Sequence, residues 1–287
     1  MKQMKMTPKL QKKIQMYVRA GIQLWFFLFL PSAFTTAFSG IKYIFTQIGL
    51  GSAIELTAFV TVLLVLCAYT ILFGRFFCGY ACAFGALGDA VHGLYVWICK
   101  KCRKKPIEIS PRWRKWLSGL KYVVLAVICL LCFLGVYASM TGWSPWDVFS
   151  MLRAGNIRLS AYVLGVILLV FIIVGMAFCE RFFCRFLCPM GAVFALLPTL
   201  PILSIRRKRS DCAKGCTACR RVCPADLELP EEGSWTVNGD CFQCQKCIQI
   251  CPKKNAHSGF RFFRGNEIWY TLLRAAILAL MLILAGV

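Results

Sequence analysis

Eight cysteines between Asp211 and Pro252 fall into two runs, each of which ends in Cys-Pro. The second run has the bacterial C-x2-C-x2-C-x3-C-P spacing for [4Fe-4S] ligands, and the first has one extra residue in its first gap. Three thiolates on a tight loop can bind three corners of an iron–sulfur cubane, so this spacing predicts clusters that transfer single electrons. The first run consists of Cys212, Cys216, Cys219 and Cys223, and the second of Cys241, Cys244, Cys247 and Cys251.

The fourth cysteine of each run is expected to serve the other cluster. It is set beside a proline and turned away from its own loop, and in paired bacterial runs this cysteine ligates the cluster of the partner run. Because the runs are meaningful only as a pair, residues 205–264 are predicted to form a bacterial-type 2[4Fe-4S] ferredoxin-like domain. The expected ligands are Cys212, Cys216, Cys219 and Cys251 for one cluster, and Cys241, Cys244, Cys247 and Cys223 for the other.

Two other uses of clustered cysteines are disfavoured. A zinc ribbon also uses C-x2-C pairs, but it needs only four ligands and has no need for the Cys-Pro endings. A disulfide framework requires an oxidising compartment, and the distribution of basic residues described below predicts a cytoplasmic location for this segment.

The composition indicates a membrane protein with a modest polar portion. Of the 287 residues, 59% are hydrophobic, and the mean hydropathy is +0.66, which favours membrane spans over two soluble domains. The net charge of +22 is explained by basic flanks on the cytoplasmic side of such spans. Because phosphate-binding glycine motifs and RNA-type aromatic signatures are missing from the sequence, nucleic-acid binding is not expected.

Apolar stretches predict a mainly α-helical, polytopic membrane protein with four to five transmembrane helices. Pro31 interrupts the first stretch, and residues 41–51 are expected to form a short re-entrant or interfacial segment. The fifth stretch contains Arg274, which must snorkel or face a partner. The predicted spans are residues 21–38, 53–73, 122–139, 161–178 and 268–287. The predicted units are a basic arm (1–19), a first span pair (20–98), a basic loop (99–121), a second span pair (122–200), the cluster domain (205–264) and a last span (268–287).

The basic residues between the spans predict the orientation of the chain. All except four of the 34 lysines and arginines lie in the N-terminal arm, the 75–121 region or the 181–264 region. The exceptions are Lys42, Arg153 and Arg158 in the opposite loops and Arg274 within the last span. Because cytoplasmic flanks are enriched in lysine and arginine, the N-terminus and the cluster domain are expected on the cytoplasmic side of the inner membrane.

A second cysteine pattern recurs at a constant offset of 106 residues. The motif R-F-F-C-x3-C-x2-G-A follows the second and fourth predicted spans, and its copies, here called elbows, begin at Arg75 and Arg181. Each copy reaches the cytoplasmic face in the same orientation, as in parallel internal repeats. A C-x3-C pair puts two sulfurs on one face of a helical turn, so a twofold arrangement could bring four cysteines to a third metal or cluster site. Alternatively, they are small apolar residues packed at the elbow. The four elbow cysteines are Cys78, Cys82, Cys184 and Cys188.

The other candidate residues give weaker signals. The C-x2-C pair of Cys99 and Cys102 has no second pair in its loop. His92 and His257 are not placed for a bis-histidine haem, and no C-x-x-C-H motif occurs. Candidate proton acceptors are Glu55, Asp147 and Glu180, and the cysteines expected only to pack in apolar segments are Cys67, Cys129, Cys132 and Cys179.

Taken together, the spans, the two elbows and the paired cysteine runs resemble the NapH/NosR-type membrane ferredoxins over residues 20–255. The resemblance implies a quinol dehydrogenase-like redox component that passes electrons between the quinol pool, or a cytoplasmic donor, and an extracytoplasmic ferredoxin, flavoprotein or cytochrome. Three features depart from the family pattern: Cys82-Ala83 in place of Cys-Pro, the extra residue in the first run, and the fifth span. A specific role with nitrate or nitrous-oxide reductase is therefore not implied.

Two other functional classes stay open. A maturation or assembly factor would use its clusters to reduce a metal or thiol of another protein, and it would need a solvent-open elbow. A redox sensor would need an additional output domain, which we do not find in the sequence. Respiratory transfer would instead call for an apolar, quinone-sized cavity near the membrane surface. No catalytic side chain is assigned, because the chemistry is expected to depend on the cofactors.

Overall fold

The computed structural model describes residues 8–107, 109–140, 142–153, 155, 162–200, 203–232, 234, 237–258 and 267–287. The described chain is mainly helical, and its two short strands form one antiparallel pair in which β1 (Ile205–Arg206) lies opposite β2 (His257–Ser258). The predicted arm (1–19) and cluster domain (205–264) therefore extend beyond the described residues at 1–7 and 259–264.

The helices follow the apolar stretches and the elbows of the sequence. Two five-residue π-helical turns, η1 (Phe77–Ala81) and η4 (Phe183–Leu187), occupy the two elbows. The α-helices are α1 (Pro8–Phe29), α2 (Ala33–Leu50), α3 (Ala58–Phe73), α4 (Ala83–Lys101), α5 (Pro111–Leu117), α6 (Leu120–Phe133), α7 (Pro145–Arg153), α8 (Val163–Phe178), α9 (Pro189–Leu196), α10 (Ala218–Arg221), α11 (Lys246–Ile250) and α12 (Glu267–Leu284). The short 3-10 turns are η2 (Val136–Ser139) and η5 (Arg209–Asp211).

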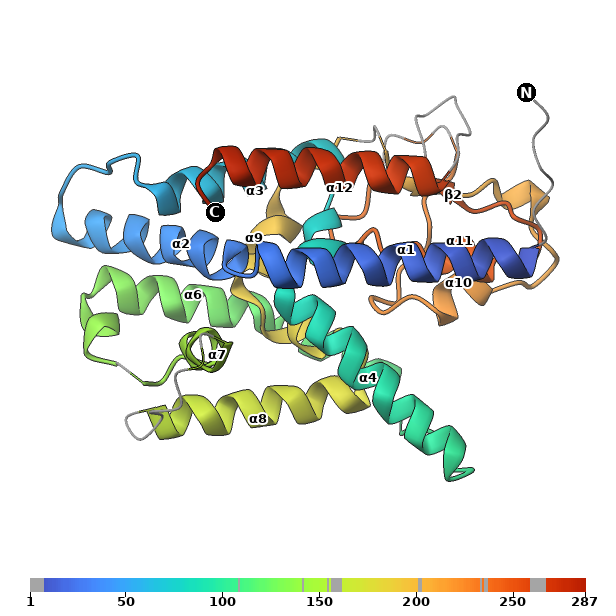
Figure 1. Ribbon diagram of the computed structural model, residues 1–287, viewed down its shortest axis with the longest axis horizontal. Helices are drawn as coiled ribbons and strands as arrows, with labels where there is room; N and C mark the ends of the chain where they lie inside the picture. The colour runs from blue at the N-terminus through green and yellow to red at the C-terminus, as the bar shows by residue number, and fades with distance from the viewer. Residues whose placement is uncertain are drawn as a thin grey trace.

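The molecule is elongated, with an apolar helical bundle at one end and the cysteine runs at the other (Figure 1). Helices α2, α3, α6, α8 and α12 run along the long axis, and α2 packs against both α3 and α6. Helix α1 contacts η1, α4 and α12, and its Arg19 reaches the loop of the second cysteine run at the Cys244 carbonyl. The elbows lie between the two ends, and their cysteines belong to the main apolar core together with Phe242 and Cys244.

Within the described residues, two helical stretches are long and apolar enough to cross a membrane, Arg112–Phe133 and Glu267–Leu284. The bent pair Lys13–Phe29 and Ala33–Leu50 would be a third if it formed one span, while α3 and α8 are apolar but have only 16 residues each. Outward-facing apolar side chains, such as Val163, Ile167 and Val170 of α8, are exposed. An apolar surface of this kind indicates a membrane protein. By length, two or three helical stretches of the described residues qualify as spans, so the predicted number of four to five is not confirmed.

The first predicted span, residues 21–38, is not one helix. Helix α1 ends at Phe29 and α2 begins at Ala33, with a bend of 60° between them. Pro31 explains the break, because it has no N–H to continue the hydrogen-bond ladder and its ring clashes with the preceding turn. The intact helix beside α3 is therefore α2.

Residues 41–51 are also not a separate re-entrant segment, because residues 41–50 complete α2. The base within them is accommodated by two aromatic rings: the Lys42 amino group lies 5.1 Å from the ring centre of Phe38 and 5.3 Å from that of Tyr137. Cation–π contacts of this kind partly compensate a charge in an apolar setting. Helix α2 ends at Gly51, whose φ of 66° is the left-handed conformation that favours glycine at a helix end.

The internal repeat is visible as two segments with the same order of elements and the same chain direction, α3–η1–α4 and α8–η4–α9 (Figure 1). The copies differ after the elbow. Helix α4 has 19 residues, whereas α9 has eight and ends shortly before Pro198. The common part of the repeat is thus an apolar helix followed by a π-helical turn and the start of a new helix.

Candidate iron–sulfur and thiolate sites

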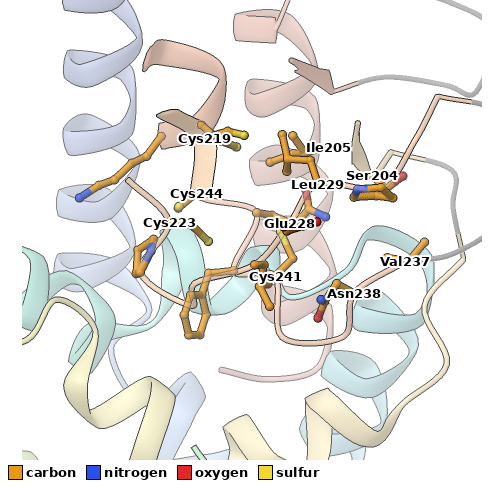
Figure 2. Close-up of a pocket in the computed structure, with 17 residues that line it drawn as sticks. Ser204, Ile205, Cys219, Cys223, Glu228, Leu229, Val237, Asn238, Cys241 and Cys244 are labelled. Carbon is orange, nitrogen blue, oxygen red and sulfur yellow. The ribbon is translucent and has the colours of Figure 1, made fainter. Parts of the chain in front are cut away.

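The second cysteine run and Cys223 meet at one pocket. Figure 2 shows Cys219, Cys223, Cys241 and Cys244 around this pocket, which Cys247 also lines. The loop that carries Cys241 and Cys244 turns tightly because Gln243 and Gln245 have φ values of 53° and 61°. Cys247 lies within electrostatic range of Cys244, Cys241 and Cys223.

Cys244 and Cys247 are buried, whereas Cys223 and Cys241 are half-buried and interact with backbone N–H groups. The N–H of Gln243 donates to Cys241, and the N–H groups of Leu227 and Ala225 donate to Cys223. Burial raises the pKa of the Cys241 thiol to about 12, so without a metal this thiol stays protonated. Since a bound metal deprotonates its cysteine ligands, the three thiols of the second run together with Cys223 are a donor set around one pocket that fits a [4Fe-4S] cluster.

The first run lies beside this pocket on the outer side. Asn255 connects Cys212 with Cys251: its side-chain amide donates to Cys212 Sγ at 3.4 Å, and its backbone N–H donates to Cys251 Sγ at 3.2 Å. Cys219, on α10, accepts a hydrogen bond from Arg207 Nη1 at 3.1 Å. Cys216 lines the same outer groove as Cys212. The last cysteine of the second run is therefore near the first run, as Cys223 is near the second.

Within the described residues, no group of three or more His, Cys, Asp and Glu side chains is arranged around a point that could hold a single metal ion. A cubane differs from such a site because each of its four thiolates binds a different iron.

The four elbow cysteines come together from the two repeats. Cys188 is within electrostatic range of Cys184, Cys78 and Cys82, and Cys82 is within range of Cys184 and Cys78. All four side chains are buried, with 3–5% of their surface exposed. Cys82 and Cys188 precede the first residues of α4 and α9, and the Cys188 sulfur accepts the N–H of Gly191, three residues later, at 3.2 Å. A helix N-terminus is a favourable place for a thiolate.

An arginine from each elbow crosses to the other repeat. Arg181 donates to the backbone carbonyls of Cys78 and Gly79, the latter at 2.9 Å. It passes so close to Gly85 that a Cβ there would lie 2.6 Å from Arg181 Nη1. In the same way, a Cβ on Gly191 would lie 2.9 Å from Nη2 of Arg75. The glycine of each elbow therefore makes room for the arginine of the other.

Each crossing arginine meets a carboxylate, but the two carboxylates come from different places. Arg181 binds Asp89 of α4 at 2.5 and 2.9 Å, and Asp89 also pairs with Arg19 of α1 at 2.6 Å. Arg75 binds Asp240, next to the second cysteine run, at 3.1 Å, and Asp240 also pairs with Lys121. Sequence reasoning assigned no role to these charged residues, although the constant arginine in the two motif copies was a usable signal.

The cluster loop is seated directly on the elbows. The Phe242 carbonyl oxygen occupies the space beside Gly79, and the Gln243 amide lies 3.1 Å from where a Cβ on Gly74 would be. Arg19 Nη1 donates to the Cys244 carbonyl at 3.4 Å. Glycine is thus required at Gly79 because the backbone of the cluster loop approaches closely, and it is favoured at Gly74 because φ there is 71°.

The remaining predicted residues lie elsewhere. The His92 ring hydrogen-bonds with the Ala177 carbonyl at 2.9 Å, and His257 lies 3.6 Å from Glu232. Of the candidate proton acceptors, Glu180 pairs with Lys246, while Glu55 and Asp147 lie in the connection before α3 and in α7. Cys99 is buried near the end of α4, and Cys102, just after this helix, is exposed. The cysteines that lie within or at the end of the apolar helices are Cys67, Cys129, Cys132 and Cys179.

Comparison with known proteins agrees with these features. The sequence profile of a family described as "4Fe-4S binding domain" matches twice, over residues 56–105 and 162–209, so that each match contains one elbow. Two uncharacterized proteins of Methanocaldococcus jannaschii are 29% and 28% identical, over 68% and 87% of this chain and 68% and 98% of their own length. The ferredoxin-type protein NapH of Haemophilus influenzae is 27% identical over 69% of this chain and 67% of its own length. No solved structure gives a significant match.

Apolar helices, paired cysteine runs and a repeated 4Fe-4S binding profile define a ferredoxin-type electron-transfer protein of the membrane. Further relatives, among them NosR, NirI and MauN, share the matched region. These relatives and the repeated profile support a NapH/NosR-type ferredoxin family for this chain.

Proposed function

We propose that the chain is a multi-pass inner-membrane electron conduit with two [4Fe-4S] clusters. Cys212, Cys216, Cys219 and Cys251 would hold one cluster, and Cys241, Cys244, Cys247 and Cys223 the other. When bound, the clusters supply one-electron transfer. The observation that carries this proposal is the exchange of the two last cysteines: Cys223 lines the pocket of the second run, and Cys251 shares Asn255 with Cys212.

The protein's own residues would hold and tune these clusters. Hydrogen bonds to cluster sulfurs are among the factors that set reduction potentials. Arg207 donates to Cys219, and Asn255 donates to both Cys212 and Cys251. The cluster of the first run therefore has a charged donor and an amide donor at its ligands, whereas the cluster of the second run has mainly backbone donors.

Electrons would pass between quinol, or a cytoplasmic donor, and an extracytoplasmic ferredoxin, flavoprotein or cytochrome. A soluble ferredoxin would be sufficient for electron transfer within the cytoplasm. The attachment of the clusters to apolar helices therefore suggests electron transfer to or across the membrane. The hydrocarbon core is about 30 Å thick, and two clusters on one side cannot bridge it. A relay toward the other side, through quinol, a further cofactor or a partner subunit, is part of this proposal.

The alternative, a maturation factor that reduces a metal or thiol of another protein, has less support. Such a factor would need elbow cysteines that a client metal or thiol can reach. The four elbow sulfurs are instead almost completely buried beneath the cluster loop. This burial favours an internal electron path over delivery to a client.

A reduction experiment on the full-length protein tests the proposal. The anaerobically purified chain with full iron content is reconstituted in liposomes and mixed with menaquinol or with reduced ferredoxin. We expect cluster absorbance and EPR signals to change within the turnover time for at least one donor, and a Cys67→Ser control on α3 to behave like the wild type. Clusters that stay inert to both donors despite full iron content would overturn the conduit and favour the maturation factor.

A further inference from the structure

The four elbow cysteines form a buried donor set that the two proposed clusters do not use. Two sulfurs come from each repeat, and all four lie near one another at the contact between the repeats. Packing alone would require small apolar side chains here, but it would not require a guanidinium group from each repeat beside them. The surroundings of the sulfurs therefore decide between packing and ligation.

Arg75 is the first sign of a missing partner. Its side chain is 1% exposed, and Nη1 binds Asp240. Its buried Nε and Nη2 have no nitrogen or oxygen partner among the described residues, and the interaction that its side chain makes at the elbow is with the Cys78 thiol. Donors without such a partner are costly in a protein interior. Nη2 lies beside Gly191, and Arg75 interacts electrostatically with Cys78 and Cys188. These donors are thus next to the sulfurs.

The charges around the sulfurs are the second sign. On one side, Arg181 and Arg19 share a single carboxylate, Asp89. On the other side, Arg75 and Lys121 share Asp240. Each group leaves one positive charge uncompensated in a buried place, where an unpaired charge is strongly disfavoured. An oxidised iron–sulfur cluster with four thiolates carries two net negative charges, which would balance these two groups.

We propose that Cys78, Cys82, Cys184 and Cys188 bind a third iron–sulfur centre, shared by the two repeats, that exchanges electrons with the cluster of the second cysteine run. Each repeat contributes two thiolates, and Arg75 contributes the N–H donors that tune the centre. A single electron leaves one cluster and enters the other, so one is oxidised as the other is reduced, and no proton or further reactant is required. This inference rests on the proposed function, because the second-run cluster is the electron partner.

The contact between the two centres is built from Phe242 and the crossing arginines. Phe242 lies between Cys241 and Cys244 in the sequence, and its ring is 4.8 Å from Arg75 Cζ and 5.9 Å from Arg181 Cζ. Arg75 is within electrostatic range of both Cys241 and the elbow sulfurs, and Arg181 is within range of both Cys244 and Cys184. An electron that leaves the cluster of the second run toward the helical bundle would therefore be transferred to the third centre.

Metal analysis of the anaerobically purified full chain tests the third centre. We expect about eight iron atoms from the two clusters of the cysteine runs and about two to four more, with matching acid-labile sulfide. The double variant Cys82→Ser with Cys188→Ser should lose only the additional iron and one EPR species. A matched variant with Cys129→Ser and Cys132→Ser, also in apolar surroundings, should keep the full iron content and all EPR species.

A second variant keeps the test decisive if the double variant does not fold. Arg75→Gln leaves all four thiols in place but removes a positive charge and N–H donors, so we expect the elbow EPR species to remain and its midpoint potential to fall. A wild type with only about eight irons and four alkylatable elbow thiols would overturn the third centre, and so would stoichiometric zinc at these thiols.

The failure of this inference is distinguishable from failure of the proposed function. Cys247→Ser should remove iron of the second run and leave the elbow species intact. If the wild type instead lacks the two clusters of the cysteine runs, the proposed function fails, whatever the elbow thiols bind.

Discussion

The guanidinium carbon of Arg75 lies 4.8 Å from the ring centre of Phe242, the residue between two cysteines of the second run. Arg181, from the other elbow, approaches the same ring to 5.9 Å. One aromatic side chain of the cluster loop is thus held by both halves of the internal repeat. Desolvated cation–π contacts contribute on the order of 2 kcal/mol, so this ring both attaches the loop and fixes its place relative to the elbows.

Replacing this ring should weaken the whole junction. Phe242 is 3% exposed, and we expect Phe242→Ala to lower the free energy of unfolding by about 3–5 kcal/mol, because burial and cation–π contacts are lost together. Thermal unfolding in detergent measures the effect. The control is Phe171→Ala, whose ring is exposed on α8 and should change stability by less than about 0.5 kcal/mol. Equal losses for the two variants would contradict the anchoring role.

The glycines of the elbows give a second test, with a control in the same helix. A Cβ on Gly85 would lie 2.6 Å from Arg181 Nη1 and 2.8 Å from the Cys78 carbonyl oxygen, whereas a Cβ on Gly93 would have open space around it. We expect Gly85→Ala to destabilise by about 1–3 kcal/mol through overpacking. Gly93→Ala should stabilise by about 0.4–1 kcal/mol, because alanine is less flexible in the unfolded chain. Unfolding midpoints that move together would refute the crossing of Arg181.

Asp89 should make the acid stability of the protein depend on one carboxylate. Burial opposes its charge, but Arg181 and Arg19 prevail and hold the pKa of Asp89 below its ordinary value. A lowered native pKa contributes stability that is fully present above the unfolded pKa of about 4 and is lost as the pH falls through the native value. Asp89→Asn should therefore flatten the acid side of the stability profile.

The same variant should also lower stability at neutral pH, by about 3–5 kcal/mol, because two buried arginines lose their shared partner. Unfolding midpoints between pH 3 and pH 8 measure both effects. Asp211→Asn is the control, since Asp211 is half exposed and lies 4.0 Å from Lys208. A profile for Asp89→Asn that runs parallel to the wild type would contradict the prediction.

Much of this site followed from the sequence because cysteine spacing is a direct constraint on ligand geometry. The spacing predicted that Cys223 and Cys251 would change places, and the 106-residue offset predicted that the elbows would face each other. The pairing of Arg75 with Asp240 was not predictable, because the two residues are 165 positions apart. Periodicity also did not locate the break at Pro31, since membrane helices tolerate proline when neighbouring groups satisfy the freed carbonyl.

If the fourth cysteine of each run binds the cluster of the other run, a substitution at that cysteine should reduce the iron content of the other run's cluster. Cys223→Ser should reduce the iron bound by the second run and alter its EPR signal, although Cys223 belongs to the first run in sequence. Cys216→Ser, its matched control within the same run, should affect the other cluster. Iron counting together with redox-poised EPR distinguishes the two signals. Loss of the same species in both variants would mean that each run binds its own cluster.

The final prediction concerns the side of the membrane on which the clusters lie. The basic loop and the cluster segment must be on the same side, because Arg114 binds Asp226 at 3.4 Å and Lys121 binds Asp240. The connection between α2 and α3 lies at the far end of the bundle (Figure 1), and Ser52 is an exposed residue of this connection. Because bases accumulate on the cytoplasmic side, a cysteine-free reporter that is active only in the cytoplasm should work when inserted after Lys104 and fail after Ser52.

A reporter that requires the extracytoplasmic side should give the opposite pattern. This second reporter is the control for insertions that merely disrupt the fold, since a misfolded chain would give no activity at either position with either reporter. Activity after Lys104 only outside the cytoplasm would reverse the orientation, and the clusters would then face extracytoplasmic donors. Because Arg114 and Lys121 tie the basic loop to the cluster segment, one insertion site reports on both.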